Sequence, residues 1–109
     1  MKKTQKLKPA QLESVARLFA ALAEPSRLCL LQNLRQGPRT VNELVKKCRL
    51  KQANVSKQLA ILYDAHLVAR RRSGNLVHYQ ISDPIVFALC DRVCAKVSKD
   101  AKRQGIHWR

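Results

Sequence analysis

The stretch from Thr40 to Ile81, TVNELVKKCRLKQANVSKQLAILYDAHLVARRRSGNLVHYQI, decides the fold of this chain. It opens with Thr40-Val41-Asn42-Glu43, which has the spacing of a capping box. In that arrangement the threonine hydroxyl and the glutamate carboxylate each accept a hydrogen bond from an end N–H group of the helix. The sequence therefore predicts a short helix from Val41 to about Cys48.

A second helix is predicted from just after Leu50 to about Ala65, because apolar residues recur there at helical spacing. Two short helices joined by a tight turn can brace each other so that the second lies in the major groove of DNA. Amide, small and lysine side chains suit base edges and phosphate oxygens, although such a face can also be merely solvated. The predicted outward-facing, DNA-binding residues are Gln52, Ala53, Asn54, Ser56, Lys57 and Gln58.

The period of the apolar residues then changes from 3.6 to 2, which predicts a β-hairpin. Its strands are Val68–Arg72 and Val77–Ile81, joined by a turn at Ser73-Gly74-Asn75. Three arginines on the first strand would meet the DNA backbone or minor groove beside the second helix. They are Arg70, Arg71 and Arg72. Helix, turn, helix and hairpin together predict a mostly α-helical, winged helix-turn-helix fold that binds DNA.

Three more helices are predicted outside this stretch, which gives about five in all. One begins at Pro9, one begins at Pro25 and ends before Gly37-Pro38, and the last runs from Pro84 to about Lys99. The last helix has a wide apolar face, which suits a homodimer interface. We expect three regions: a basic mobile arm at 1–8, a winged helix-turn-helix DNA-binding and dimerisation domain at 9–99, and a basic C-terminal tail at 100–109.

The charge of the chain predicts a polyanionic partner. The 109 residues include 22 Lys+Arg and 7 Asp+Glu, for a formal net charge of +15. Double-stranded DNA is the first expectation and an anionic membrane is the competing one. No run approaches the roughly 18 apolar residues of a membrane span, and the N-terminus lacks the apolar core of a signal peptide. We therefore expect a cytoplasmic protein with reduced cysteines and no membrane partner.

Five segments of the sequence together resemble the ArsR/SmtB family of bacterial transcriptional repressors, over roughly Leu12 to Val97. These are Ala21–Leu28, Thr40–Leu44, Asn54–Leu59, Asp64–Val68 and Val77–Ile81. The resemblance implies a homodimer, paired through its first and last helices, that leaves a near-palindromic operator when an inducer binds. The expected interface residues are Leu12, Val15, Phe19, Val86, Leu89, Val93 and Val97.

The chain departs from the family pattern at several positions. Lys51 replaces the serine that usually caps the recognition helix, and His66 replaces a glycine, so that His66 is either strained or left-handed. Family members often sense metals through a cysteine pair near the end of the helix before the recognition helix, or through Asp and His on the last helix. Here those places hold the single thiol of Cys48 and Asp91 without a histidine, so neither familiar metal site is expected.

Cys90 and Cys94 are the candidate inducer residues, because i and i+4 thiols on one helix face can reach one soft ion. Two copies would bring four thiols to a dimer seam. That set suits a thiolate-bound thiophilic metal or metalloid, or a reactive sulfur or oxidant species; no other cofactor is expected. The alternative is that both thiols only pack, as we expect of Cys29 and Cys48.

Two other functional classes remain to be weighed against an inducible, sequence-specific repressor. One is a constitutive, nucleoid-type nucleic-acid-binding protein whose cysteines are purely structural. The other is an enzyme, which is not expected: the sequence has no glycine-rich phosphate loop, no G-x-S-x-G motif, no paired carboxylates and no histidine placed to activate a thiol.

Overall fold

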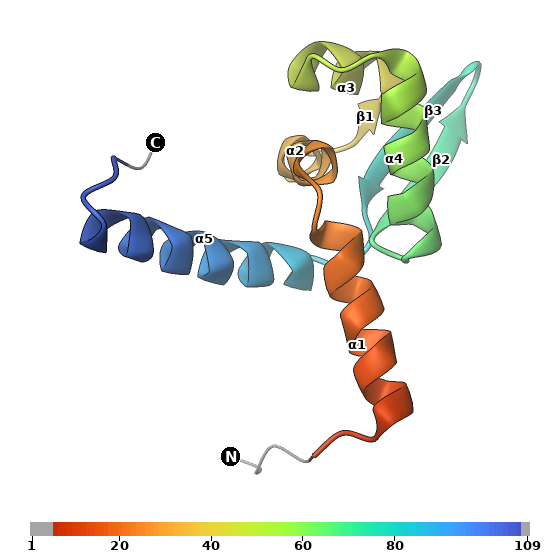
Figure 1. Cartoon of the computed structure of the whole chain (residues 1–109). Coiled ribbons are helices and arrows are strands. Elements are labelled where there is room, and N and C mark those ends of the chain that lie inside the picture. Colours follow the sequence, from red (N-terminus) through yellow and green to blue (C-terminus); the bar gives the residue numbers. More distant parts are fainter. Residues whose placement is uncertain (1–5, 108–109) are drawn as a thin grey trace.

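The computed structural model describes residues 6–107, which form five helices and one three-stranded antiparallel sheet (Figure 1). The elements are α1 (Pro9–Leu22), α2 (Pro25–Leu34), β1 (Arg39–Thr40), α3 (Val41–Cys48), α4 (Gln52–Asp64), β2 (Val68–Ser73), β3 (Leu76–Ile81) and α5 (Ile85–Arg103). The predicted winged helix-turn-helix architecture is confirmed: α3 and α4 are the two helices of the motif, and β2 and β3 form the wing.

Local hydrogen bonds explain where α3 begins. Its predicted capping box is confirmed: the Glu43 amide donates to Thr40 Oγ1 at 3.2 Å, and the Thr40 amide donates to Glu43 Oε1 at 2.8 Å. The bond from the Thr40 amide also lowers the pKa of the Glu43 carboxyl. The first helix of the motif therefore starts at a fixed residue.

Removing this cap should weaken the fold by a small, measurable amount. We expect Thr40→Ala to lower the free energy of unfolding by about 1 kcal/mol, because the substitution removes an acceptor for the first turn. Urea denaturation followed by circular dichroism measures the change. Asn42→Ala is the matched control, since Asn42 is an exposed residue of the same turn with no capping bond. Equal losses in the two variants would mean that the box does not contribute.

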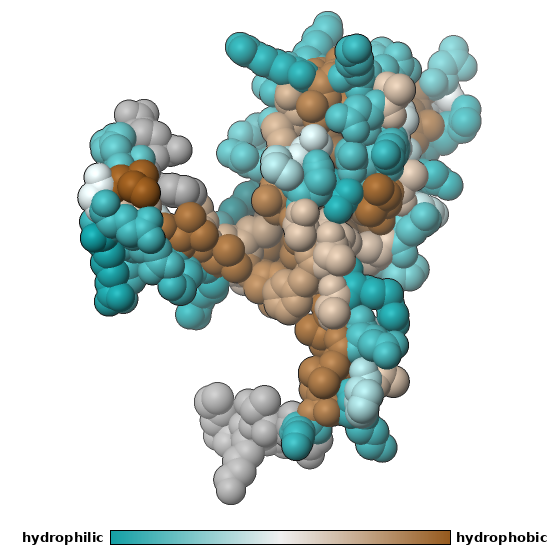
Figure 2. Space-filling model, in the orientation of Figure 1, coloured by the Kyte–Doolittle hydropathy of each residue, from teal (hydrophilic) through white to brown (hydrophobic). Residues whose placement is uncertain are grey.

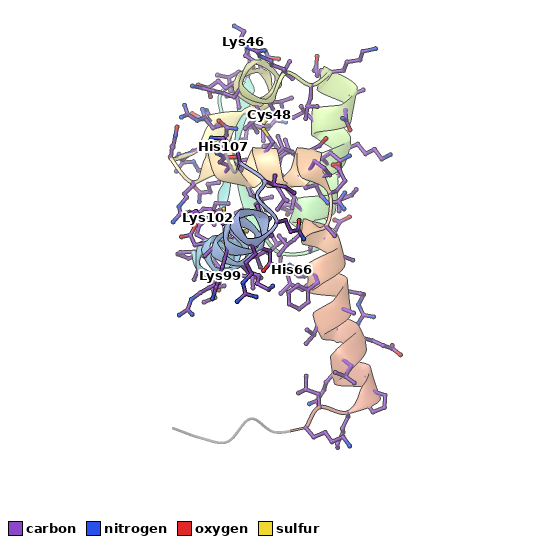
Figure 3. All side chains as sticks on the ribbon, turned by 60° about the vertical axis from the view of Figure 1, so that its left-hand side comes forward. Lys46, Cys48, His66, Lys99, Lys102 and His107 are labelled. Carbon is purple, nitrogen blue, oxygen red and sulfur yellow. The ribbon has the colours of Figure 1, made fainter. Side chains whose placement is uncertain are left out.

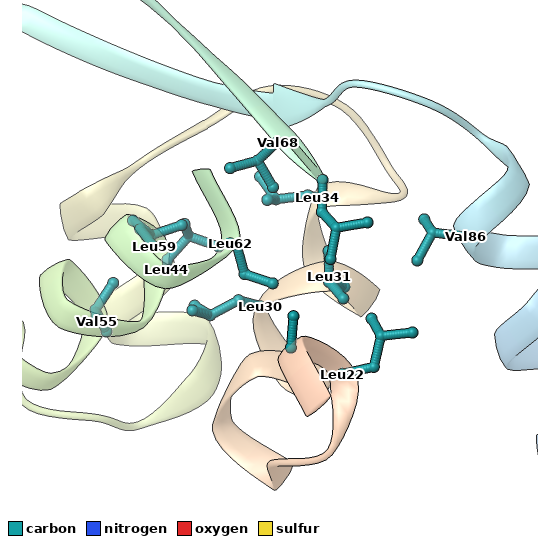
Figure 4. Close-up of a cluster of buried hydrophobic side chains, with 12 residues drawn as sticks. Leu22, Leu30, Leu31, Leu34, Leu44, Val55, Leu59, Leu62, Val68 and Val86 are labelled. Atoms are coloured by element: carbon teal, nitrogen blue, oxygen red, sulfur yellow. The ribbon is translucent and has the colours of Figure 1, made fainter. Parts of the chain in front are cut away.

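The core of the domain lies where α2, α3 and α4 converge (Figure 4). Its largest fully buried side chains come from the apolar faces of these three helices. They are Leu30, Leu44, Val55, Leu59 and Leu62. Burial of aliphatic side chains stabilises a domain by about 1.5–3 kcal/mol each. The helix-turn-helix is thus held by α2 from behind, which leaves the opposite face of α4 free.

The wing is part of a three-stranded sheet in the order β1-β3-β2. β2 and β3 pair antiparallel from Val68 opposite Ile81 to Ser73 opposite Leu76. The turn between them is Gly74-Asn75, and Gly74 adopts the left-handed conformation, with φ of 62°. β1 pairs with β3 beside the start of α3. This strand was not predicted, since two residues are too few to show a period.

The last helix is longer than predicted. α5 continues through Arg103 instead of ending at about Lys99, so the helix crosses the expected boundary between domain and tail at 99/100. Lys102 and Arg103 lie in the last turn, where positive charge interacts favourably with the helix dipole. Of the predicted arm at 1–8, residues 1–5 lie outside the described part of the chain, and residues 6–8 have no regular structure.

Two helices project from this body (Figure 1). α1 and α5 leave it in different directions, and the Cα radius of gyration is 16.2 Å, against about 13 Å for a compact domain of this length. None of the helices among residues 6–107 combines the length and apolar character needed to cross a bilayer.

Candidate functional site

The outer face of α4 is open to solvent. Gln52, Ala53, Ser56 and Lys57 are exposed, and Asn54 is half-buried. Their predicted contact with DNA needs such exposure, and it stays a prediction. The face consists of small and polar side chains on a helix whose other side packs into the core.

Gln58 does not belong to this face, which corrects its predicted role in DNA binding. Its side chain is 7% exposed. Gln58 Oε1 accepts a hydrogen bond from Arg27 Nη1 at 2.7 Å, and Gln58 Nε2 donates to Asn54 Oδ1 at 3.0 Å. The apolar period of α4 already indicated this, because Gln58 lies on the same side as Val55 and Leu59.

Arg27 extends these bonds to α1. Its guanidinium donates to the carbonyl of Ala21 at 2.7 Å and to that of Ala20 at 3.2 Å, while also holding Gln58. Carbonyls in the last turn of a helix have no partner within the helix, so a cation satisfies them well. A polar network missed in the sequence therefore connects the end of α1, through α2, to the recognition helix α4.

The turn between the two helices of the motif is shaped by backbone conformation. α3 ends at Cys48, and Arg49 follows as a left-handed C-cap with φ of 54°. Lys51 precedes α4 and gives it no side-chain cap, as its identity predicted. His66 has φ of 61° after α4, so the left-handed alternative is confirmed there.

The wing arginines are all exposed, but they face two ways. Arg70 stacks its guanidinium over the Tyr63 ring of α4, 4.1 Å from the ring centroid. Because side chains alternate along a strand, Arg72 lies on the same side as Arg70, and Arg71 lies on the other side. The cation–π contact places one wing charge directly beside the recognition helix.

Of the candidate inducer residues on α5, Cys90 packs against the core of its own subunit, and Cys94 lies one turn farther along the helix. Cys90 is half-buried, and burial raises the pKa of its thiol; Cys94 is exposed. Between them, Asp91 accepts two hydrogen bonds from Arg35, the residue that follows the last turn of α2, at 2.8 and 2.9 Å. This hydrogen-bonded pair lowers the pKa of the Asp91 carboxyl and raises that of Arg35. Asp91 is thus engaged with Arg35 and does not extend the thiol pair.

A single subunit does not complete a metal site there. Within residues 6–107 no group of three or more His, Cys, Asp or Glu side chains is placed to hold an ion. Two thiols from one helix would need further ligands from a second copy.

The predicted dimer residues divide into two groups. Val86 is 3% exposed and belongs to the core of its own subunit, so its assignment to the interface is wrong. Leu89 is half-buried against the same core. The remaining predicted residues are large and exposed: Leu12, Val15, Phe19, Val93 and Val97. Figure 2 shows apolar surface along both projecting helices, and exposed Leu18 and Ile85 also belong to it.

Cys29 and Cys48, expected only to pack, are brought together. Cys48 is the last residue of α3 and faces α2 (Figure 3), where its Sγ lies 2.6 Å from Sγ of Cys29. The sequence gives no sign of this contact, because the two residues belong to different helices and are far apart along the chain.

An exposed helix braced by a shorter one and flanked by a cationic hairpin defines a winged helix-turn-helix domain. Comparison with known proteins assigns its family. Residues 24–70 match the family described as "bacterial regulatory protein, arsR family". An uncharacterized HTH-type transcriptional regulator of Mycobacterium tuberculosis is 37% identical over 89 residues, covering 78% of both proteins. The chain belongs to the ArsR family of bacterial regulatory proteins.

Two further relatives bear on its function. A probable mercury resistance operon repressor of Streptomyces lividans is 42% identical over 74 residues, which cover 68% of this chain and 59% of that repressor. The chain thus spans less than two thirds of that relative. The solved structure of Mb0332 from Mycobacterium bovis, a homodimeric winged helix-turn-helix DNA-binding domain, matches with a TM-score of 0.74 and 31% identity, covering 100% of this chain and 99% of that one.

Proposed function

We propose that this protein is a sequence-specific transcriptional repressor that binds double-stranded DNA as a homodimer in the bacterial cytoplasm. The observation that carries the proposal is the exposed polar face of α4 beside the arginine wing. A helix of this kind fits the major groove, and arginines beside it fit phosphates or the minor groove. The similarity to a mercury-operon repressor supports the same function.

The homodimer is supported by the surface that one subunit leaves exposed. Its accessible surface is 8674 Å², whereas a folded 12.4 kDa monomer exposes about 6100 Å². This excess of accessible surface accompanies two projecting helices, α1 and α5, which carry large exposed apolar side chains. Mb0332 is a homodimer of the same fold. Pairing through these helices would present two copies of α4 to half-sites about one helical turn apart.

A DNA titration tests this function. We expect the protein to bind a fluorescent duplex from the region upstream of its own gene at least about a thousandfold more tightly than a scrambled duplex at near-physiological salt. Fluorescence anisotropy measures both affinities in the same buffer. Equal affinities would support the alternative, a constitutive nucleoid-type protein for which charge alone determines binding.

Release from the operator is proposed to occur through Cys90 and Cys94. Cys94 is exposed on α5 and Cys90 lies half-buried one turn before it, so pairing of two subunits along α5 would bring four thiols near one another. Such a set can take a thiophilic metal or metalloid, or react with an oxidant or reactive sulfur species. The two residues would hold the ion or carry the modification, and their subunits would shift to accommodate it.

The thiol pair can be tested without knowing the natural inducer. We expect the C90S/C94S variant to bind operator DNA with unchanged affinity and to lose the release caused by arsenite, a mercury(II) salt or inorganic polysulfide in the wild-type protein. Anisotropy during stepwise addition of each probe measures release. Ala95→Ser, on the same exposed stretch of α5, is the matched control and should respond as the wild type does. Full release from C90S/C94S would show that the pair only packs.

A further inference from the structure

The two thiols that meet between α2 and α3 have no role in the proposed function. The Sγ atoms of Cys29 and Cys48 are 2.6 Å apart, and both residues are half-buried. The two side chains therefore adjoin each other, as the two halves of a disulfide must. Asn33 lies beside both, with its Nδ2 atom 3.4 Å from the Cys48 sulfur and 3.6 Å from the Cys29 sulfur.

We propose that Cys29 and Cys48 form a redox lock: a hydroperoxide converts the two thiols to a disulfide that fastens α3 to α2 while leaving the DNA-reading face in place. The pair is separate from Cys90 and Cys94, which lie on α5. The disulfide itself does not depend on the proposed repressor function, whereas the statement about DNA rests on it.

The chemistry balances with the hydroperoxide as the only oxidant. Burial raises the pKa of Cys48 to about 12, so its thiol stays protonated at neutral pH and Cys48 acts in the second step. The Cys29 sulfur attacks a peroxide oxygen, the O–O bond breaks, and a sulfenic acid and water or an alcohol form. The Cys48 sulfur then attacks the sulfenic sulfur; the S–S bond forms, the S–O bond breaks, and hydroxide leaves with the thiol proton as water.

The position of the pair explains why the lock would spare DNA binding. Cys48 is the last residue of α3 and Cys29 lies on α2, so the bond would join two helices that already pack in the same core. Formation of the bond between Cys29 and Cys48 would not require the exposed side chains of α4 and the wing to move. Asn33 holds the site in place, because its amide also donates to the carbonyl of Cys29 at 2.9 Å. A crosslink there restricts the unfolded chain more than the folded one.

The test uses the full chain with C90S/C94S, in which Cys29 and Cys48 are the only cysteines. After treatment with hydrogen peroxide we expect both thiols to be lost together and one peptide to link residues 29 and 48 within a single subunit, as read by thiol titration and mass spectrometry. The reductant tris(carboxyethyl)phosphine should restore both thiols. The unfolding equilibrium constant in urea should fall about a hundredfold in the oxidised protein.

The control carries C48S in the same background, leaving Cys29 alone. It should form no link within the subunit and show no such stabilisation. Links only between subunits, oxygen added to the sulfurs without a link, or no thiol loss would overturn the lock; so would a stable metal adduct in place of a crosslink.

DNA titration of the reduced and oxidised C90S/C94S protein separates the two proposals. Equal affinities support a lock that spares the reading face, and a marked loss on oxidation overturns that part of it. If the reduced protein fails to bind DNA at all, the repressor function is wrong, while the crosslinking result still decides whether the lock exists.

Discussion

Replacing Arg70, Arg71 and Arg72 together by alanine is expected to weaken operator binding about a thousandfold at roughly 0.15 M salt. The change removes three charges from each wing and six from the proposed dimer. Each phosphate contact contributes about 0.9 to the slope of log affinity against log salt, so the slope should become shallower by up to about five. Anisotropy titrations at several salt concentrations measure both quantities.

A variant with the same loss of charge on another surface provides the control. Lys99, Lys102 and Arg103 lie on α5, far along the chain from the wing, and all three are exposed. Their combined replacement by alanine should change the slope much less than the wing variant does. An equal effect from both triple variants would mean that the wing makes no particular contact with DNA. Arg70→Ala alone tests whether the Tyr63 stack matters for that contact.

The second large effect is expected in the assembly of the dimer. Phe19 is 50% exposed on α1, and burying a phenylalanine contributes about 1.5–3 kcal/mol. About half of that burial remains to be gained, and a two-fold interface contains Phe19 twice, so Phe19→Ala should raise the dimer dissociation constant roughly tenfold to a hundredfold. Sedimentation equilibrium over a range of protein concentrations measures the constant directly.

Leu76→Ala is the matched control for this prediction. Leu76 is 51% exposed, close to Phe19 in exposure, but it lies in the wing and outside the proposed interface. Its replacement should leave the dissociation constant unchanged. The dimer would be contradicted by a wild-type protein that sediments as a monomer at every concentration, and the interface would be contradicted by a dimer indifferent to Phe19.

The elements that the sequence predicted well have strong local signals. The α3 start follows from Thr40 and Glu43, whose capping bonds need no distant residue. The helices and wing follow from apolar periods of 3.6 and 2. β1 escaped prediction because two residues have no period, and the end of α5 was placed too early because charged residues after Lys99 conceal a helix that continues to Arg103.

Errors in the candidate site have a different physical cause. Gln58 is polar and stands among polar neighbours, so composition suggested an outward side chain, while its helical position places it inside with Arg27. Val86 was assigned to an interface because the apolar face of α5 is continuous, although the part of this helix from Val86 to Cys90 packs on the subunit's own core. The Cys29–Cys48 contact depends on how α2 and α3 cross, which local sequence does not contain.

The bonds of Arg27 to the end of α1 and to Gln58 have a mechanical consequence. The Gln58 amide is buried and has no water to replace its bond to Arg27. If the Arg27 guanidinium moves, the amide must therefore move with it or lose the hydrogen bond. In the proposed dimer, α1 belongs to the pairing surface, and any rotation of one subunit against the other would pull on the carbonyls of Ala20 and Ala21. The distance between the two copies of α4 would therefore depend on the relative orientation of the subunits. The spacing of operator half-sites that the dimer can bind would depend on it too.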